Sequence, residues 1–108
     1  MKIVDYYTEG GKNLIKEYLS NLPVIERTYG YAIRHKIIND GLNAFYGLNT
    51  RQLVGNLWEI KFFNNRIMYV VLDKETVHFL HACKKQKGKA EKFELDKAIQ
   101  RAKEQNLL

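Results

Sequence analysis

The stretch "LWEIKFFNNRIMYVV", residues 57–71, constrains the fold most strongly. Its apolar residues alternate with more polar ones, which is typical of a β-strand with one buried face. The residues of that apolar face are Trp58, Ile60 and Phe62. The pair Asn64-Asn65 is a turn signal, because asparagine tolerates the left-handed backbone conformation. The segment therefore predicts a β-hairpin.

The rest of the chain predicts one further strand before this hairpin, one after it, and three helices. The four predicted strands span residues 2–8, 57–63, 66–72 and 76–83. Apolar residues at helical spacing predict helices in "NLIKEYLSNL" from Asn13, after Pro23 and after Gly88. In the second helix the stripe is Ile25, Tyr29, Ala32, Ile33 and Ile37. Residues 46–56 contain two glycines and two asparagines and are predicted to be a loop.

This order of elements, βααβββα, predicts a single α+β domain over residues 1–108. An antiparallel meander needs one covered face, and the two N-terminal helices can cover it. We therefore expect Trp58, Ile60 and Phe62 to be buried against residues 13–43.

Charged side chains interrupt the apolar strands. If Ile60 faces the helices, then Glu59 and Lys61 face away from them, about 7 Å apart on one side of the sheet. Arg66 opens the next strand, and Lys84 follows the last one. The pattern predicts a charged cluster on an open face of the sheet, where each side chain is mostly solvated. An ordinary solvated face without any function explains the same pattern.

The chain is basic, with a net charge of +6 from 18 basic and 12 acidic residues. Such an excess favours a polyanionic partner, although a merely soluble basic protein is equally compatible with it. The segment "KKQKGKAEK", residues 84–92, holds five lysines against one glutamate. Its lysines and Arg51 are candidates for contacts with single-stranded or ribosomal RNA. The residues proposed for RNA binding are Arg51, Lys85, Lys87 and Lys89.

Other features favour a cytoplasmic protein without a membrane partner. The N-terminus lacks the apolar core of a signal peptide, and no apolar run approaches the roughly 20 residues of a membrane span. Cys83 is the only cysteine, so an internal disulfide is impossible.

We predict no metal and no organic cofactor. His78 and His81 differ by an odd number in a strand, which places them on opposite faces. His81 and Cys83 share a face, but two ligands do not make a site.

The ordered set "LWEIKFF-NNRIMYVV…VHFLHACKKQ…AIQRAKE" resembles the phage-type HigB toxins of the RelE superfamily. Those chains read L-W-E-L-R, then a hairpin, Y-R-V-x-Y, a strand ending in L-H-x-F-x-K-K, and a helix with A-x-x-R. The matching residues are Leu57, Trp58, Glu59, Ile60, Lys61, Arg66, Tyr69, Leu80, His81, Lys84, Lys85, Ala98 and Arg101. Lys61 stands where arginine is usual, which keeps the charge but loses the guanidinium fork.

The resemblance implies a RelE-like fold and a metal-independent endoribonuclease, an mRNA interferase. Such toxins cut mRNA on the ribosome by attack of a 2′-hydroxyl on the adjacent phosphate. Lys61 and Arg66 would then neutralise the transition state, and Lys84 would bind phosphate or transfer a proton. The proton acceptor would be Glu59 or His81. Glu59 can instead orient the cations through salt bridges, and His81 can be a partly buried residue of the sheet.

The implied partners are mRNA, the ribosome and a cognate antitoxin, a small helix-turn-helix protein. Two other functions remain open at this point. ParE-like toxins share the architecture but target DNA gyrase. A non-enzymatic module of the same fold would bind nucleic acid or an antitoxin without cutting anything.

Overall fold

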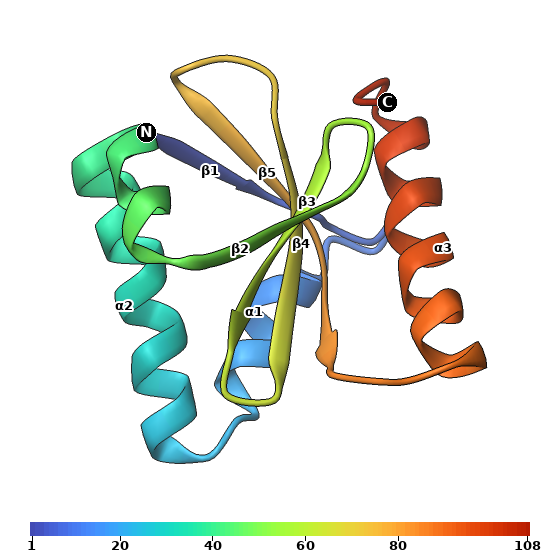
Figure 1. Cartoon of the computed structure of the whole chain (residues 1–108), viewed down its shortest axis with the longest axis horizontal. Coiled ribbons are helices and arrows are strands. Elements are labelled where there is room, and N and C mark those ends of the chain that lie inside the picture. Colours follow the sequence, from blue (N-terminus) through green and yellow to red (C-terminus); the bar gives the residue numbers. More distant parts are fainter.

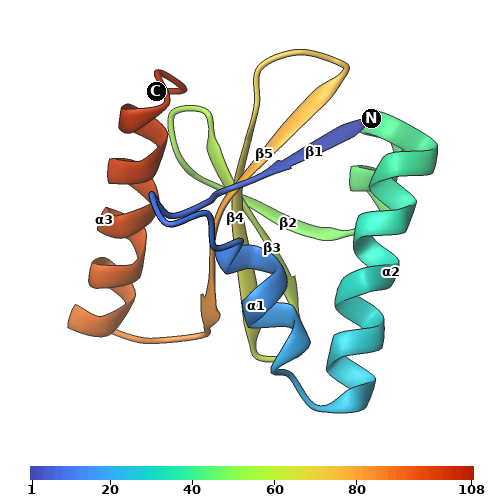
Figure 2. The ribbon, with the colours of Figure 1, turned by 180° about the vertical axis from the view of Figure 1, so that it is seen from behind.

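The computed structural model describes residues 1–108 and has an α+β fold, as predicted. Its elements are β1 (Lys2–Asp5), α1 (Leu14–Ser20), α2 (Val24–Asp40), the 3₁₀-helix η1 (Gly41–Gly47), β2 (Asn49–Val54), β3 (Leu57–Phe62), β4 (Asn65–Val71), β5 (Thr76–Lys84) and α3 (Lys89–Glu104). The strands form one sheet in the order β1-β5-β4-β3-β2. Helices α2 and α3 lie on opposite sides of this sheet, and α1 lies near α2 (Figures 1 and 2). No helix combines the length and the apolar character needed to cross a membrane.

The sheet has five strands and is mixed, so the prediction of four strands in an antiparallel sheet is wrong in two respects. Strands β2 to β5 form an antiparallel meander, while β1 pairs with β5 in parallel. Strand β2 lies inside residues 46–56, which were predicted to be a loop. Its sequence "NTRQLV" is mostly polar because β2 is an exposed edge strand that buries little.

The β3–β4 turn lies one residue earlier than predicted. Phe62 pairs with Asn65, so Phe63 and Asn64 form the two-residue loop. Phe63 has a φ of 52°, whereas Asn64 keeps a negative φ. A positive φ at only the first loop position is the pattern of a type II′ turn, in which that position is normally glycine.

The first core lies between the sheet and helices α1 and α2. Ile60 and Phe62 are buried there, as expected. Trp58 is 37% exposed, so its predicted burial is wrong. It shares the hollow beside η1 with Phe45 and Tyr46, beyond the part of the sheet that α1 and α2 cover. The core residues are Ile15, Leu19, Leu22, Ile33, Ile37, Ala44, Ile60, Phe62, Ile67, Tyr69, Val77 and Phe79.

Helix α2 buries a different face from the predicted stripe in its first half. Ile33 and Ile37 are buried as expected, whereas Ile25 and Tyr29 are exposed. Gly30 takes part in the contact instead, because a Cβ there would lie 2.8 Å from a methyl group of Leu19 on α1. Ile25 and Tyr29 lie outside this crossing, and Tyr29 contacts Phe62 and Phe63 at the β3–β4 turn.

The second core lies under α3, on the face of the sheet that was expected to be open. Its residues are Leu57, Met68, Val70, Leu80, Cys83, Ala98, Ala102 and Leu107. Because α3 covers this face, the charged side chains of β3 and β4 are largely removed from solvent. The prediction of an open, solvated face is therefore wrong.

A bulge in β5 changes the direction of its side chains. The register shifts so that Met68 pairs with His81 but Tyr69 pairs with Phe79, which leaves Leu80 as the extra residue. His78 pairs with Val70 of the second core, and His81 contacts α3. Both histidines thus lie on the α3 side, and the prediction of opposite faces is wrong.

Candidate functional site

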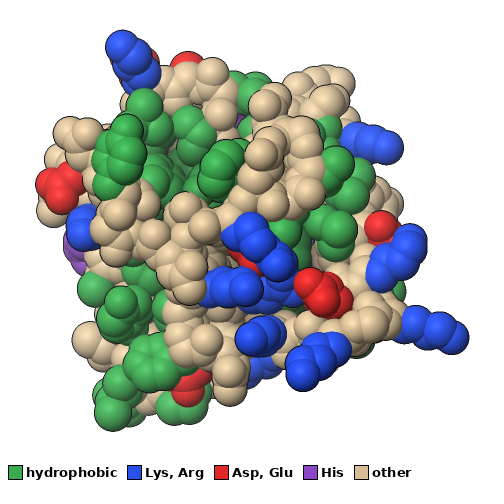
Figure 3. Space-filling view, viewed as in Figure 1, with side chains coloured by type: hydrophobic (Ala, Val, Ile, Leu, Met, Phe, Trp, Pro, Cys, Tyr) green, Lys and Arg blue, Asp and Glu red, His purple; other side chains and the backbone are tan.

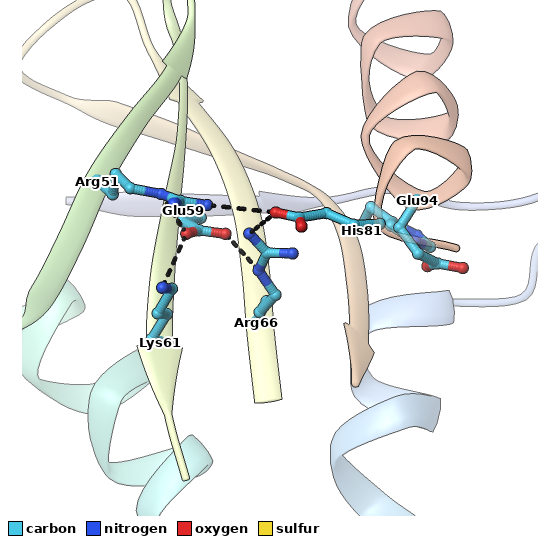
Figure 4. Close-up of polar contacts among 7 residues, drawn as sticks. Arg51, Glu59, Lys61, Arg66, His81 and Glu94 are labelled. Carbon is cyan, nitrogen blue, oxygen red and sulfur yellow. Dashed lines mark hydrogen bonds and ion pairs between the residues drawn. The ribbon is translucent and has the colours of Figure 1, made fainter. Parts of the chain in front are cut away.

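Glu59 is the centre of a charged cluster on the α3 side of β3 (Figure 4). Arg66 Nε donates a hydrogen bond to Glu59 Oε2 at 2.5 Å. Arg51 Nε and Lys61 Nζ lie 2.9 and 3.7 Å from Oε1. Arg66 also donates to Glu91 of α3 through Nη2, at 3.3 Å. One fully buried carboxylate therefore binds three cationic side chains from three neighbouring strands.

The strand register explains this convergence. Arg51 of β2 lies directly opposite Glu59, and Lys61 of β3 lies directly opposite Arg66. Residues opposite each other in an antiparallel pair share a face, as do residues two apart in one strand. Glu91, in the first turn of α3, accepts a hydrogen bond from Arg66 and so joins the cluster from the helix. Glu91 was not predicted from the sequence, because a single glutamate in a lysine-rich segment does not indicate a contact with Arg66, which lies in a distant part of the chain.

Arg66 differs most from expectation, because it is 2% exposed. Burial by itself lowers the pKa of Arg66, but the hydrogen bonds and charges of Glu59 and Glu91 more than reverse this, so its net pKa is raised. The guanidinium therefore stays charged and is held in one orientation. Lys61 is partly exposed and Arg51 is half-exposed.

A polar hollow opens beside this cluster, at the β3–β4 turn. It has a volume of about 240 Å³. We call it the cationic hollow. Its lining residues are Asn49, Lys61, Phe62, Phe63, Asn65, Arg66 and Lys85. The lining contains three cations and no carboxylate. Lys and Arg side chains gather over the middle of the face shown in Figure 3. Such a hollow suits an anion such as a phosphate group.

Two adjacent lysines of "HACKKQ" take different positions. Lys85 lines the cationic hollow. Lys84 lies on the α1 side, where its Nζ donates to Asn65 Oδ1 at 2.9 Å and lies 3.6 Å from Glu26. The strand alternation explains this, because Cys83 points towards α3 and the next side chain points the other way. The predicted place of Lys84 beside Arg66 and among other cations is therefore wrong.

The remaining predicted RNA-binding lysines surround the start of α3. Lys87 lies in the connection after β5, and Lys89 is the first residue of α3. Both are exposed, so the structure leaves them available for contacts with a polyanion.

His81 belongs to a second cluster, separate from Glu59 in Figure 4. We call it the His81 cluster and define it as His81, Cys83, Glu94 and Arg101. Arg101 Nη1 donates to His81 Nδ1 at 3.0 Å and to the Leu80 carbonyl at 2.9 Å. An arginine has no acceptor, so Nδ1 must be the acceptor and Nε2 carries the proton that bonds Glu94. Burial lowers the pKa of His81 and keeps the ring neutral, although Glu94 opposes this shift.

Glu94 was not among the predicted site residues, although a helical pattern carries it. Glu94, Ala98 and Arg101 follow one another at spacings of four and three, which places them on one side of α3. Ala98 of this series is fully buried in the second core. The pattern becomes informative only when the face that α3 packs against is known.

The His81 cluster also contains a possible set of metal ligands. Ligand atoms of His81, Cys83 and Glu94 all lie within 4.8 Å of one another. A metal on His81 Nε2 requires the proton on Nδ1, where the Arg101 donor now points. Burial also raises the pKa of the Cys83 thiol to about 12, whereas metals bind the thiolate. A metal would therefore have to displace Arg101 and deprotonate a buried thiol.

Comparison with protein families gives one match. The model of the family described as "Phage derived protein Gp49-like (DUF891)" matches residues 17–103, a span that includes the cationic hollow and the His81 cluster. No curated protein matches the chain significantly.

Proposed function

Because the chain belongs to the family of phage-derived Gp49-like proteins, we propose that it is the toxin of a type II toxin–antitoxin system and cuts mRNA on the ribosome. Family membership itself indicates a phage-derived, toxin-like protein. The motif resemblance to HigB toxins of the RelE superfamily supports the finer assignment. The observation that carries the proposal is the cationic hollow, in which Lys61, Arg66 and Lys85 converge without a carboxylate in the lining.

In the proposed reaction the 2′-hydroxyl of one nucleotide attacks the phosphate that follows it and gives up its proton to a solvent water molecule. The bond from phosphorus to the 2′-oxygen forms as the bond to the 5′-oxygen breaks, which leaves a 2′,3′-cyclic phosphate and a free 5′-hydroxyl. Negative charge grows on the phosphate oxygens in the transition state, and fixed cations stabilise that charge without having to reorganise. Arg66 is the fixed cation, because Glu59 and Glu91 hold its guanidinium. Lys61 and Lys85 are more exposed than Arg66, and either ammonium group can protonate the leaving 5′-oxygen.

We assign Glu59 a positioning role in place of the proton acceptor considered from sequence. It is fully buried and does not line the hollow, so a 2′-hydroxyl cannot reach it without displacing the cations. Its Oε1 accepts no well-formed hydrogen bond although Arg51 Nε lies 2.9 Å away, so the contact is one of charge attraction. Glu59 thereby draws Arg51, Lys61 and Arg66 together at one place.

This function implies a cognate antitoxin, and we propose a small helix-turn-helix protein for this role. Acidic side chains of such a partner can neutralise the toxin by filling or covering the cationic hollow. A neighbouring gene that encodes a protein of this kind is the expected observation.

The decisive experiment compares Lys61→Ala and Lys85→Ala with the wild type. Removal of one donor to the transition state commonly slows an enzyme by about 100-fold or more. Both side chains are at least partly exposed, so the free energy of unfolding should change by only about 0.5 kcal/mol. We expect both variants to lose growth arrest and cleavage of mRNA on translating ribosomes while their thermal midpoints stay close to that of the wild type.

Lys74→Ala is the matched control, because Lys74 is an exposed lysine in the β4–β5 turn, at the other end of these strands. Its loss removes the same charge without touching the hollow. Growth arrest with intact mRNA and a DNA damage response would indicate a gyrase-targeting toxin instead. If Lys61→Ala and Lys85→Ala both stay fully toxic and cut mRNA at the rate of the Lys74→Ala control, the cationic hollow is not the site.

A further inference from the structure

Phe63 stands out at the rim of the cationic hollow. Its side chain is 58% exposed, and it lines the hollow together with Lys61, Arg66 and Lys85. Its backbone has a φ of 52°, at the turn position where glycine is normal. A bulky side chain in this conformation is strained, and strain of this kind is found mainly at functional sites. The chain thus keeps an aromatic ring where folding alone favours glycine.

The ring of Phe63 is supported from one side. Tyr29 of α2 packs against it edge-to-face, with ring centroids 5.7 Å apart and an angle of 88° between the planes. Tyr29 in turn stacks on the buried Phe62, at 6.1 Å. These contacts hold the exposed ring beside the hollow, which limits the conformational entropy that a ligand must overcome to stack on it.

We propose that Phe63 is a stacking platform for a nucleobase next to the phosphate held in the cationic hollow. This inference rests on the proposed ribonuclease function and names the part of the RNA that the site recognises beyond its backbone. An aromatic face next to a group of cations is the arrangement with which proteins bind single-stranded nucleic acid. The ring has no hydrogen-bonding group, so it selects bases by stacking strength and favours purines over pyrimidines.

The variants Phe63→Gly and Phe63→Trp separate stacking from folding. Glycine relieves the backbone strain, so Phe63→Gly should have a thermal midpoint equal to or above that of the wild type. Loss of one base–aromatic contact should slow cleavage by about 5-fold to 150-fold. Tryptophan keeps an aromatic face, and Phe63→Trp should cut at close to the wild-type rate.

The test uses ribosomes programmed with a short mRNA whose cleavage position is mapped with the wild type. The base on either side of that position is then removed by placing an abasic nucleotide there. At one of the two positions, the abasic mRNA should slow the wild type by about the same factor as Phe63→Gly slows cleavage of the intact mRNA. Phe63→Gly should cut that abasic mRNA no more slowly than it cuts the intact one, because both changes remove the same contact.

Three outcomes would overturn the inference. If the wild type cuts the mapped mRNA and Phe63→Gly cuts it equally well, Phe63 is not a platform. If the effects of the variant and of the abasic nucleotide multiply at both positions, Phe63 acts on something other than these bases. If Phe63→Gly loses growth arrest in cells yet cuts at the wild-type rate in vitro, Phe63 contacts a protein. Absence of any cleavage by the wild type contradicts the proposed function itself.

Discussion

The two polar clusters on the α3 side of the sheet differ in how well their charges are matched. In the His81 cluster, Arg101 and Glu94 enclose a neutral ring: Arg101 donates to His81 and to the Leu80 carbonyl, and His81 donates to Glu94. Around Glu59, three cations share one buried carboxylate, and only Glu91 adds a second. Matched charges hold a fold together, whereas unmatched cations beside an open hollow attract an anion.

The size of a hollow does not distinguish the two regions. His81 and Arg101 line a larger hollow beside α1, with a volume of about 410 Å³. Glu17 lines it as well, and Lys84, its other cation, already binds Asn65 and lies near Glu26. The smaller cationic hollow is the better anion site, because its lining contains only cations and neutral groups.

The largest expected effect is on the buried pair of Glu59 and Arg66. Arg66→Ala leaves a buried carboxylate short of its main partner, and breaking such a pair costs about 3–5 kcal/mol. We expect about 3 kcal/mol, because Arg51 and Lys61 still lie near Glu59. On a solvated face the same substitution would cost only about 0.5 kcal/mol or less. Urea unfolding of Arg66→Ala measures this difference.

A double variant separates the fold from the function of this pair. In Glu59→Leu/Arg66→Met both charges are replaced by apolar side chains, which commonly restores the stability lost with a buried ion pair. We expect the double variant to unfold at a higher urea concentration than Arg66→Ala, yet to cut no mRNA. An Arg66→Ala protein as stable as the wild type would show that the pair does not hold β3 and β4 together.

The sequence allowed the local parts of this site to be predicted, but not its burial. Alternation along β3 correctly placed Glu59 and Lys61 on the face opposite Ile60 and Phe62. Whether that face is covered depends on α3, some 30 residues further along the chain, and local patterns do not carry such information. For the same reason Arg66 was expected to be solvated.

Two other wrong predictions, the loop in place of β2 and the facing of residues on β5, have local causes that the pattern of apolar and polar residues does not reveal. An edge strand such as β2 is polar on both faces, so its sequence "NTRQLV" is indistinguishable from that of a loop. The bulge at Leu80 is a single extra residue. It reverses which face of the sheet each residue on one side of it occupies relative to residues on the other side. The bulge accounts for the wrong prediction that His78 and His81 lie on opposite faces. Lys85, already predicted to bind RNA, lines the cationic hollow, whereas Lys84 does not.

The His81 cluster should make the protein less stable in acid. Burial lowers the pKa of His81 in the folded protein. Just below about pH 6.5, His81 is therefore protonated in the unfolded chain but still neutral in the folded one. Stability is then lost as pH falls from there through the folded pKa, by up to about 1.4 kcal/mol per pH unit. Glu94, whose pKa is also lowered, adds a loss of the same sign at lower pH. Thermal midpoints between pH 7.5 and 5 measure the slope.

His81→Gln is the matched variant, because a glutamine amide can donate to Glu94 and accept from Arg101 without titrating. We expect it to flatten the loss of stability between pH 6.5 and 5. If only the unmatched cations around Glu59 form the site, this variant also cuts mRNA at close to the wild-type rate, since His81 lies outside the cationic hollow. A 100-fold loss of cleavage in a stable His81→Gln protein would instead restore His81 as the proton acceptor.

The smallest expected effect distinguishes Lys84 from Lys85, which are adjacent in sequence although only Lys85 lines the cationic hollow. Each phosphate neutralised by a protein cation adds about −0.7 to the slope of log affinity against log salt for a single strand. Lys85→Ala should flatten the slope for RNA or ribosome binding by about that amount, because Lys85 lines the cationic hollow. Lys84→Ala should leave the slope unchanged, because Lys84 already binds Asn65 and lies near Glu26 on the α1 side. Equal flattening by both variants would mean that RNA also contacts Lys84, and that unmatched charge alone does not mark the site.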